Sequence, residues 1–365
     1  MTGGLAGLAR AALFRIEPET AHRLAIRTLA SGLVRPPARP ADRRLAVTAF
    51  GLSFPNPLGM AAGFDKDAEV PDALLALGFG FTEVGTVTPL AQAGNPRPRV
   101  FRLVADHGVI NRLGFNNAGH AAARARLVAR RGRSGIVGVN IGANKDAGDR
   151  IADYVAGIET FATDASYFTL NVSSPNTPGL RGLQEGDQLV ELLGRVTAAR
   201  DAAARRTRRR LPLLLKVAPD LDDAAIETIA ATAVSSGIDG LIVANTTLGR
   251  PPLADARRGE AGGLSGRPLF RRSTVVLARF HRALGGRLPL VGVGGVESGE
   301  TAFAKVAAGA SLIQLYTGFA YAGPAVVPAV LDGLAAALEQ RRLPSLAAAV
   351  GCEAAAWAAK DPDAA

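Results

Sequence analysis

The chain has 365 residues, of which 48% are hydrophobic, and carries 42 Lys and Arg against 32 Asp and Glu, a net charge of +10. The length suits one large α/β barrel or two average domains, and the hydrophobic fraction excludes a mainly disordered chain. A single cysteine, Cys352, excludes a disulfide framework and an iron–sulfur cluster, and the four histidines lack H-x-x-x-H spacing, so no metal site is expected.

The first 45 residues differ from the rest in charge and pattern. They hold eight arginines and three acids, and Pro18 marks the expected start of a helix. One face of that helix carries Ala21, Leu24, Ala25, Thr28 and Leu29. An earlier helix is expected over Leu5–Phe14. Prolines at 36, 37 and 40 stiffen the connection to the next domain. A basic amphipathic helix pair is typical of a peripheral membrane anchor. A helical hairpin packed on the next domain is the alternative.

Apolar runs of strand length then alternate with helical patterns. The predicted strands are Leu58–Ala62, Phe81–Thr86, Ile136–Ile141, Phe168–Val172, Leu213–Val217, Leu241–Ala244, Leu290–Val293 and Leu312–Leu315. The predicted helices lie near 67–77, 117–130, 150–163, 186–205, 222–236, 268–284, 299–308 and 325–340. Eight such units predict an α/β fold, a (β/α)8 TIM barrel over residues 46–341. A doubly wound open sheet is the alternative, but no G-x-G-x-x-G follows the first strand.

In such a barrel the ligand binds where the strands end. The residues at these ends include Lys66 after the first strand, Asn140 in the third and the stretch Asn171–Thr177 after the fourth. These side chains form hydrogen bonds, and few of them are acidic, which suits a flat, anionic ligand rich in heteroatoms. A glycosidase needs two carboxylates at this position, so the pattern does not suit that class.

Three further stretches bear on partners and location. The arginines between Arg200 and Arg210 have no interleaved aromatic residues, which favours a solvated helix end over a nucleic-acid site. Glycines and prolines interrupt the uncharged stretch Val306–Leu331, and neither it nor the N-terminus predicts a membrane span or a signal peptide. The protein is therefore expected in the cytoplasm. Residues 342–365 form an Ala-rich C-terminal tail.

Six motifs, in order along the chain, resemble those of the dihydroorotate dehydrogenases. They are Ala61–Asp67, Asn95–Arg99, Asn111–Asn116, Asn171–Arg181, Gly263–Pro268 and Gly292–Gly295, and the resemblance covers about residues 15–340. An N-terminal two-helix extension, and a serine where the soluble class 1 enzymes use a cysteine, resemble the quinone-dependent class 2. The position of Cys352 agrees independently, because it lies in the tail and leaves no cysteine at the barrel mouth.

The resemblance implies a reaction and a location. Such an enzyme oxidises dihydroorotate to orotate in de novo pyrimidine biosynthesis, with one FMN per chain as hydride acceptor and a membrane quinone as final electron acceptor. Ser174 is the implied catalytic base for the C5 proton, with a relay through Thr177 and a water. A monomer without a nucleic-acid partner is expected, peripheral on the cytoplasmic side of the cell membrane. Residues 1–45 would contact the lipid and form the quinone tunnel.

The resemblance also assigns ligand contacts. Substrate contacts are implied for Lys66, Asn111, Arg112, Leu113, Gly114, Phe115, Asn171, Asn176, Asn245 and Thr246. Cofactor contacts are implied for Ala61, Ala62, Gly63, Phe64, Asp65, Lys66, Thr86, Asn140, Asn171, Lys216, Ala244, Gly266, Gly294, Gly295, Tyr316 and Thr317. The quinone site is implied at His22, Arg102 and Tyr316. Ala244 stands where many relatives have Thr, which puts one side-chain contact to FMN in doubt.

Two other hypotheses stay open on the sequence. A non-catalytic flavin- or phosphate-binding barrel would act as a scaffold, but it leaves Ser174, Lys66 and the asparagines unexplained. A dihydrouridine synthase would use a cysteine acid and bind tRNA, and the missing cysteine argues against it. A simpler interpretation of Lys66 is a salt bridge with Asp65 or Asp67.

Overall fold

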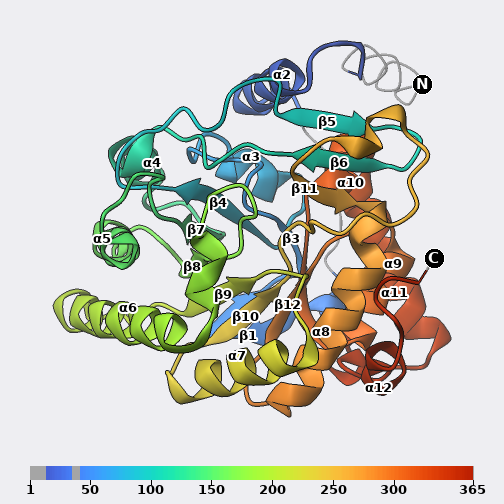
Figure 1. The fold of residues 1–365 in the computed structure, drawn as a ribbon. Helices are drawn as coiled ribbons and strands as arrows, with labels where there is room; N and C mark the ends of the chain where they lie inside the picture. Colours follow the sequence, from blue (N-terminus) through green and yellow to red (C-terminus); the bar gives the residue numbers. More distant parts are fainter. Residues whose placement is uncertain (1–13, 35–41, 365) are drawn as a thin grey trace.

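The computed structural model describes residues 14–34 and 42–364, and eight parallel strands close into a barrel (Figure 1). Around the barrel the strands are β3 (Leu58–Met60), β4 (Phe81–Val87), β7 (Ile136–Ile141), β8 (Tyr167–Asn171), β9 (Leu213–Val217), β10 (Gly240–Val243), β12 (Leu290–Val293) and β13 (Ala310–Leu315). The outer helices are α3 (Pro71–Ala76), α4 (Gly119–Ala129), α5 (Arg150–Phe161), α6 (Gly186–Thr207), α7 (Asp223–Ser235), α8 (Phe270–Leu284), α9 (Gly299–Ala307) and α11 (Val326–Gln340). The predicted (β/α)8 barrel is confirmed.

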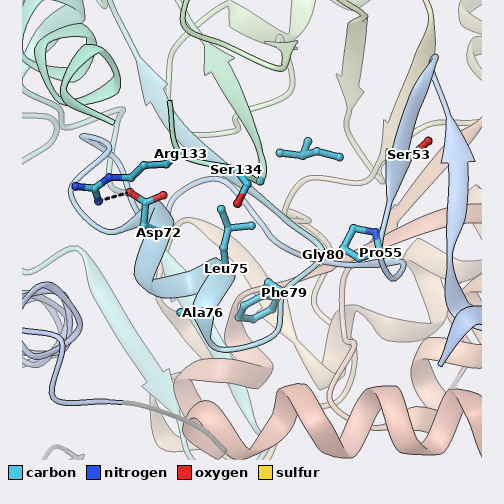
Figure 2. A pocket seen from close by; sticks show the side chains of 11 residues that line it. Ser53, Pro55, Asp72, Leu75, Ala76, Phe79, Gly80, Arg133 and Ser134 are labelled. Carbon is cyan, nitrogen blue, oxygen red and sulfur yellow. Dashed lines mark hydrogen bonds and ion pairs between the residues drawn. The ribbon is translucent and has the colours of Figure 1, made fainter. Parts of the chain in front are cut away.

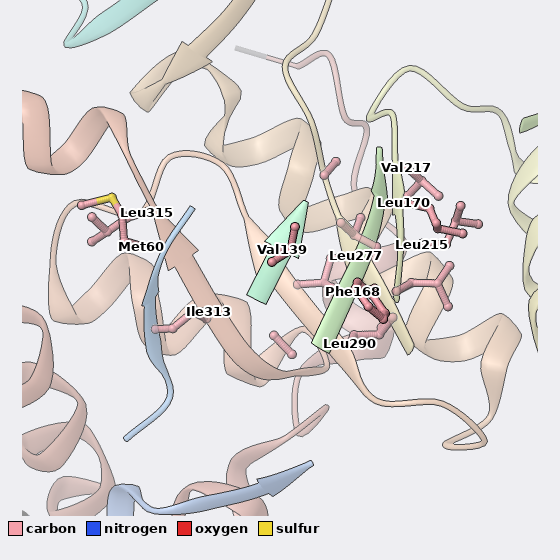
Figure 3. Packing of buried hydrophobic residues seen from close by; sticks show 14 of the residues in the cluster. Met60, Val139, Phe168, Leu170, Leu215, Val217, Leu277, Leu290, Ile313 and Leu315 are labelled. Carbon is pink, nitrogen blue, oxygen red and sulfur yellow. The ribbon is translucent and has the colours of Figure 1, made fainter. Parts of the chain in front are cut away.

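The barrel strands are buried on both faces, which is why they are read as continuous apolar runs. Their outward side chains, such as Val139, Leu215 and Ile313, face the surrounding helices and belong to the same buried cluster as Leu277 of α8 (Figure 3). Inside the barrel, glycine alternates with aromatic residues. A Cβ at Gly59 would overlap the ring of Phe81 on the neighbouring strand, so the small residue makes room for the large one.

A hairpin closes the end of the barrel where the strands begin. It consists of β1 (Val47–Ala49) and β2 (Leu52–Phe54), and it lies at the lower end of the barrel in Figure 1. The ring of Phe54 packs edge-on against Phe81 inside the barrel, with 5.2 Å between centroids. This hairpin makes the lower end a packed plug, and it was not predicted.

A second small sheet lies over the opposite end, where the barrel strands finish. Its strands are β5 (Val100–Leu103), β6 (Gly108–Asn111) and β11 (Gly263–Gly266), paired antiparallel in the order β11-β6-β5 (Figure 1). We refer to these three strands as the roof sheet. Helix α2 (Pro18–Ala30) contacts β5 and α3, so the N-terminal extension packs beside the roof sheet.

Helix α2 starts at Pro18, as predicted, and the side chain of Glu17 caps it by accepting from the backbone N–H of Glu19 and Thr20. Its predicted inward face was partly wrong. Ile26 is buried with Ala21 and Leu29, whereas Leu24 and Thr28 point outward. Contacts with β5 and α3, rather than hydropathy alone, determine which residues of α2 are buried. The expected helix over Leu5–Phe14, apart from Phe14, and the proline connection at 36–40 lie outside the described residues.

The C-terminal tail forms a 3-10 turn, Leu346–Ala349, and a short helix, α12 (Ala354–Ala358), that packs on α8. Trp357 meets Phe270 of α8 edge-on, with ring centroids 6.0 Å apart. The backbone N–H of Gly351 and Glu353 donate to Val306 O and Ala307 O at the end of α9. The tail therefore adds a 3-10 turn and a short helix to the layer of helices around the barrel.

Two surface interpretations change with the structure. Arg200 is not at a solvated helix end: it is 5% exposed, and its guanidinium donates to the Gly237 carbonyl and the Asp239 carboxylate at 3.0 and 3.3 Å. The run Thr317–Gln340 is long and apolar enough to cross a membrane by length and composition alone. It is divided into α10 (Thr317–Ala322), a 3-10 turn and α11, which packs on α9.

Candidate active site

Four strands bring a set of amide and hydroxyl groups together beneath the roof sheet. The Asn171 side-chain N–H donates to Thr86 Oγ1 at 2.8 Å, and that hydroxyl donates to Asn140 Oδ1 at 2.6 Å. The Asn245 amide donates to Asn171 Oδ1 at 3.1 Å and to Ser173 Oγ at 2.9 Å. These predicted contact residues lie on β4, β7 and β8 and just after β10, and the barrel ends bring them into one network.

Ser174 follows this network on the loop after β8 and is 6% exposed. Its hydroxyl accepts the backbone N–H of Asn176 at 3.3 Å, and the Asn176 amide donates to Asn111 Oδ1 of β6 at 3.4 Å. Asn111 pairs with Gly263 in the roof sheet. A Cβ at Gly263 would overlap the side chain of Thr246, so the glycine lets β11 approach the β10 loop closely. The structure thus groups the predicted base with three predicted substrate residues.

The segment Leu113–Phe115 offers backbone donors to the same space. Gly114 and Phe115 have positive φ, 72° and 54°, and their carbonyls accept from the Gln92 side chain. The three amides of this segment make no hydrogen bond within the described part of the chain. Successive unpaired N–H groups in such a turn form a concave anion site, which suits a carboxylate.

Two lysines carry the positive charge of the site. Lys66 is partly buried and donates to the Gly63 carbonyl at 2.7 Å. Burial lowers the pKa of Lys66 to about 8, although Asp67 and Glu19 oppose the shift. Lys216 is the last residue but one of β9, is 5% exposed, and has no hydrogen bond or ion pair among the described residues. Burial lowers its pKa as well, and the nearby Glu83 carboxylate acts against that shift.

The glycines after β12 and β11 form a cradle beside α10. Gly294 and Gly295 have φ of 108° and 73°, and their amides have no hydrogen-bond partner in the part of the chain described. A Cβ at Gly294 would lie 2.6 Å from Ser273 Oγ, so only glycine fits there. Across from them, Thr317 starts α10 and shares a 3.0 Å hydrogen bond with Ser265, next to Gly266. Free amides after the seventh and eighth barrel strands, with a short extra helix, are the usual phosphate site of this fold.

The other predicted cofactor residues lie between these parts. Ala61 and Gly63 donate backbone N–H groups to Leu315 O at 3.0 Å and Gly85 O at 2.7 Å, which fixes the loop from Ala61 through Ala62 to Lys66 under the site. Ala244 follows β10 and donates to Val293 O at 3.2 Å. Its methyl group adds no polar contact, as the sequence indicated.

An aromatic cluster connects α2 to the loop after β3. The His22 ring lies 5.2 Å from Phe64 and 6.2 Å from Tyr316, and Phe64 lies 5.6 Å from Tyr316. Burial, with help from the charge of Lys66, lowers the pKa of His22 to about 3, so this imidazole is neutral at physiological pH. Arg102 does not join the cluster directly. Its guanidinium donates to Ile16 O at 2.9 Å and lies over the Phe14 ring, which holds the chain entering α2.

Three predicted interactions take a different form in the structure. The Arg112 guanidinium is directed away from Asn111, since it pairs with Glu260 at 2.9 Å and lies over Phe101. The Asp65 carboxylate accepts the backbone N–H of Glu69 and Val70 at 2.7 and 2.8 Å, so only its backbone is near the site. Lys66 forms no ion pair with Asp65 or Asp67, both of which are described.

Sequence reasoning missed two charged residues that build the site and one that holds α2 beside it. Glu83 is a fully buried carboxylate in β4 beneath the amides. Arg181 joins two active-site loops by donating to Ser173 O and Thr246 O, both at 3.1 Å. Glu19 of α2 pairs with Arg99 at 2.8 Å, with only 12% and 5% of the two side chains exposed. A lone acid inside an apolar strand was the available signal for Glu83.

A separate cavity of about 690 Å³ lies at the opposite end of the barrel (Figure 2). Leu75 and Phe79 line it beside the Asp72–Arg133 ion pair, whose atoms are 2.9 Å apart. It contains none of the predicted site residues. The chemistry of such barrels belongs at the other end, where the strands finish.

The comparisons with known proteins agree with this geometry. A family model described as dihydroorotate dehydrogenase matches residues 44–338. The curated protein "Dihydroorotate dehydrogenase (quinone)" of Mesorhizobium japonicum is 59% identical over 95% of this chain and 96% of its own length. Its namesake in Sinorhizobium fredii is 58% identical over the same shares. The crystal structure of the Eimeria tenella DHODH with ferulenol superposes with a TM-score of 0.88, at 39% identity, over 92% of this chain and 95% of that one. The chain therefore belongs to the dihydroorotate dehydrogenase family, as its six motifs predicted.

Proposed function

We propose that this protein oxidises dihydroorotate to orotate, a step of pyrimidine biosynthesis, using FMN as hydride acceptor and a membrane quinone as final electron acceptor. The observation that carries the proposal is the buried Ser174 beside amide side chains and unpaired backbone N–H groups. A serine base, a pyrimidine-binding surface and a carboxylate site are what this oxidation requires of a protein.

The substrate would lie among the asparagines. A dihydropyrimidine ring alternates N–H and C=O groups along its edge, and neutral amides can both donate and accept. Asn176 donates to Asn111 of the roof sheet, Asn245 donates to Asn171, and both pairs offer such groups. The unpaired amides of Leu113–Phe115, with the ammonium of Lys66, would receive the carboxylate.

Ser174 would remove the C5 proton. A serine hydroxyl is a weak base, so the proton must pass onward, and the buried Thr177 three residues later is the proposed next group through a water. The loop is rigid here because Arg181 donates to Ser173 O and pairs with Asp220 at 2.9 Å. That clamp would keep the hydroxyl aimed at one carbon atom.

FMN fits the remaining groups. The Gly266, Gly294 and Gly295 cradle would hold its phosphate, and Thr86 and Asn140 would contact the ring system. Lys216 is a buried cation without a partner among the described residues, which suits the anionic edge of a reduced flavin. When bound, FMN supplies the hydride acceptor that side chains lack and a means to pass electrons to a quinone.

The quinone would reach the flavin past the N-terminal extension. Helix α2 contributes His22 to the aromatic cluster with Phe64 and Tyr316, and these rings lie beside the loop of Lys66. Residues 1–45 carry eight arginines and three acids, which would favour attachment to anionic lipid at the cytoplasmic face of the membrane. We propose this segment as the membrane-associating part of a peripheral enzyme.

Flavin absorbance of the purified full-length protein tests the proposal. The protein should be yellow, anaerobic dihydroorotate should bleach it, and a soluble ubiquinone analogue should restore the colour. NAD should restore it negligibly. A flavoprotein that dihydroorotate leaves oxidised would overturn the substrate assignment, and equal reoxidation by NAD and quinone would overturn the acceptor.

A further inference from the structure

A chain of side-chain hydrogen bonds links the substrate amides to the interior of the barrel. From donor to acceptor it runs through Asn245, Asn171, Thr86, Asn140 and Glu83, with donor–acceptor distances of 3.1, 2.8, 2.6 and 2.7 Å. We call these five residues the amide chain. Every link donates in the same direction, toward the carboxylate. Four of its members are predicted ligand contacts, and Glu83 is the exception.

Glu83 receives hydrogen bonds from all sides. Asn140 donates to Oε1, while Tyr167, Thr169 and Gln314 donate to Oε2 at 3.1, 3.1 and 3.0 Å. The four donors supply partners for both oxygens, as a group that only accepts requires. Burial and the adjacent Glu83 raise the pKa of Tyr167 well above its ordinary value, which keeps that hydroxyl a donor.

The side-chain amide of Gln314 is oriented by the Glu83 carboxylate. Its Oε1 is buried and has no hydrogen-bond partner in the described part of the chain, because its N–H2 group faces Glu83. A buried acceptor without a partner lowers the stability of the folded protein. Rotating the amide would instead place an oxygen against a carboxylate. The orientation with the unpaired oxygen is the one adopted.

We infer that Glu83 is a positioning residue that fixes which side of each site amide donates and which accepts. A carboxylate only accepts, so Asn140 must turn its N–H2 to Glu83 and its oxygen to Thr86. The Thr86 hydroxyl then donates to Asn140 and is left to accept from Asn171. Asn171 in turn presents its oxygen to Asn245. The amide chain therefore transmits one constraint from the barrel interior to the substrate surface.

Glu83→Gln reverses this constraint without changing volume. Three donors hold the oxygen of the new amide at the Oε2 position, so its N–H2 faces Asn140. Asn140 must rotate to accept, Thr86 then accepts from Asn140, and Asn171 rotates to accept from Thr86. That rotation also breaks the hydrogen bonds that the Ser173 backbone N–H and hydroxyl donate to Asn171 Oδ1 at 3.4 and 3.3 Å. The reversal stops at Asn245, whose oxygen the Thr246 backbone N–H holds at 2.8 Å. Two N–H2 groups then face each other, and the Asn171–Asn245 hydrogen bond is lost.

The test measures orotate binding by calorimetry on the FMN-loaded, full-length protein, together with the affinity of the flavin-free protein for FMN. The choice of orotate rests on the proposed function. Glu83→Gln should weaken orotate binding about tenfold, the scale of one hydrogen bond between neutral groups. Tyr167→Phe is the matched control, because it removes a donor to Glu83 outside the amide chain. It should change the orotate affinity less than about twofold.

A double variant separates amide orientation from the burial of a charge. In Glu83→Gln with Asn140→Asp, the carboxylate moves one link up the chain, the introduced glutamine amide donates to it, and Thr86 donates as in the unaltered protein. Orotate binding should recover in the double variant. If the single variant fails to fold, folding should recover as well. An unchanged orotate affinity in Glu83→Gln, or a double variant no better than the single one, would overturn the inference. If the unaltered protein does not bind orotate, the proposed function fails instead.

Discussion

At the scale of single residues, the site combines buried cations with neutral amides and almost no available acid. Asp65 uses its carboxylate to hold its own loop, and Glu83 uses its oxygens inside the barrel. Lys66 and Lys216 are therefore the charges that an anionic ligand meets. Such a site favours an anionic substrate and an anionic cofactor. Its chemistry depends on the proton that Ser174 would remove and on the proton that keeps Lys66 charged.

The first prediction concerns the base. Ser174→Ala should keep FMN bound but slow flavin reduction by dihydroorotate by about 10²–10⁴-fold, the usual contribution of a general base. Stopped-flow absorbance would measure it, with Ser174→Cys as the conservative control that keeps a proton-accepting group. Near-normal reduction in the alanine variant would show that another group removes the proton.

The second prediction concerns pH. Burial lowers the pKa of Lys66 to about 8, so the amine is protonated below pH 8 and loses its charge above it. Orotate is an anion, and its affinity should therefore fall as the pH rises through about 8. In Lys66→Arg the guanidinium stays charged, and this fall should disappear. A midpoint that persists in the arginine variant would assign the titration to another group.

The side chains that we propose as ligand contacts could be picked out of the sequence because they lie in short, continuous motifs. Ser174 with its neighbours and the Gly294–Gly295 pair are of this kind, and the structure groups each with its predicted partners. The direction of the Arg112 side chain could not be predicted in the same way. It lies inside a motif, yet its guanidinium turns to Glu260, 148 residues away in sequence, and no local pattern records that pairing.

At the scale of elements, sequence predicts what is buried on both faces and misses what is half-exposed. The barrel strands were found because every residue is apolar or enclosed. Strands β5 and β6 of the roof sheet alternate buried and partly exposed residues over only four positions, and β11 consists of glycine, leucine and serine. Four residues are too few to establish a period, and β11 pairs with β6, which lies far away in sequence.

Helix α2 forms ion pairs with the rest of the protein through Glu19, which pairs with Arg99 and Arg97, and through Arg23, which pairs with Glu69. Glu19→Gln should loosen α2, because removing one partner of a buried pair costs about 3–5 kcal/mol. Hydrogen exchange of α2 should rise and quinone turnover should fall, while flavin reduction by dihydroorotate is kept. Arg23 pairs with Glu69 but is 50% exposed, so Arg23→Ala is the control and should cost at most about 1 kcal/mol. Equal effects of the two variants would contradict this ranking.

At the scale of the whole molecule, the two ends of the barrel are unlike. One end is plugged by the β1–β2 hairpin, and the other carries the roof sheet, α2 and the site (Figure 1). The large apolar residues Leu24 and Leu33 are 48% and 82% exposed on and just after α2. Ligand chemistry and the proposed membrane contact therefore share one end.

Changing the exposed leucines tests the membrane contact in the full-length chain. Leu24→Glu with Leu33→Glu should reduce binding to anionic vesicles about tenfold or more, since burying each leucine is worth about 1.5–3 kcal/mol. Flavin reduction by dihydroorotate should be unchanged. Val190→Glu on α6, where Val190 is 56% exposed, is the control and should bind vesicles normally. Vesicle binding unaffected by the double change would remove α2 from the contact.

The roof sheet also determines when the site can exist during synthesis. Ser265 of β11 donates to Val109 O of β6 across 156 positions of sequence, and the last barrel strand, β13, must still pair with the first, β3. Contacts between such distant segments form late, because the intervening chain has to be closed into a loop first. While residues 175–315 are being translated, a nascent chain on the ribosome therefore carries Lys66, Asn111 and Ser174 without a complete pocket. Flavin capture belongs to the finished polypeptide, after the segments that carry β11 and β13 have left the ribosome.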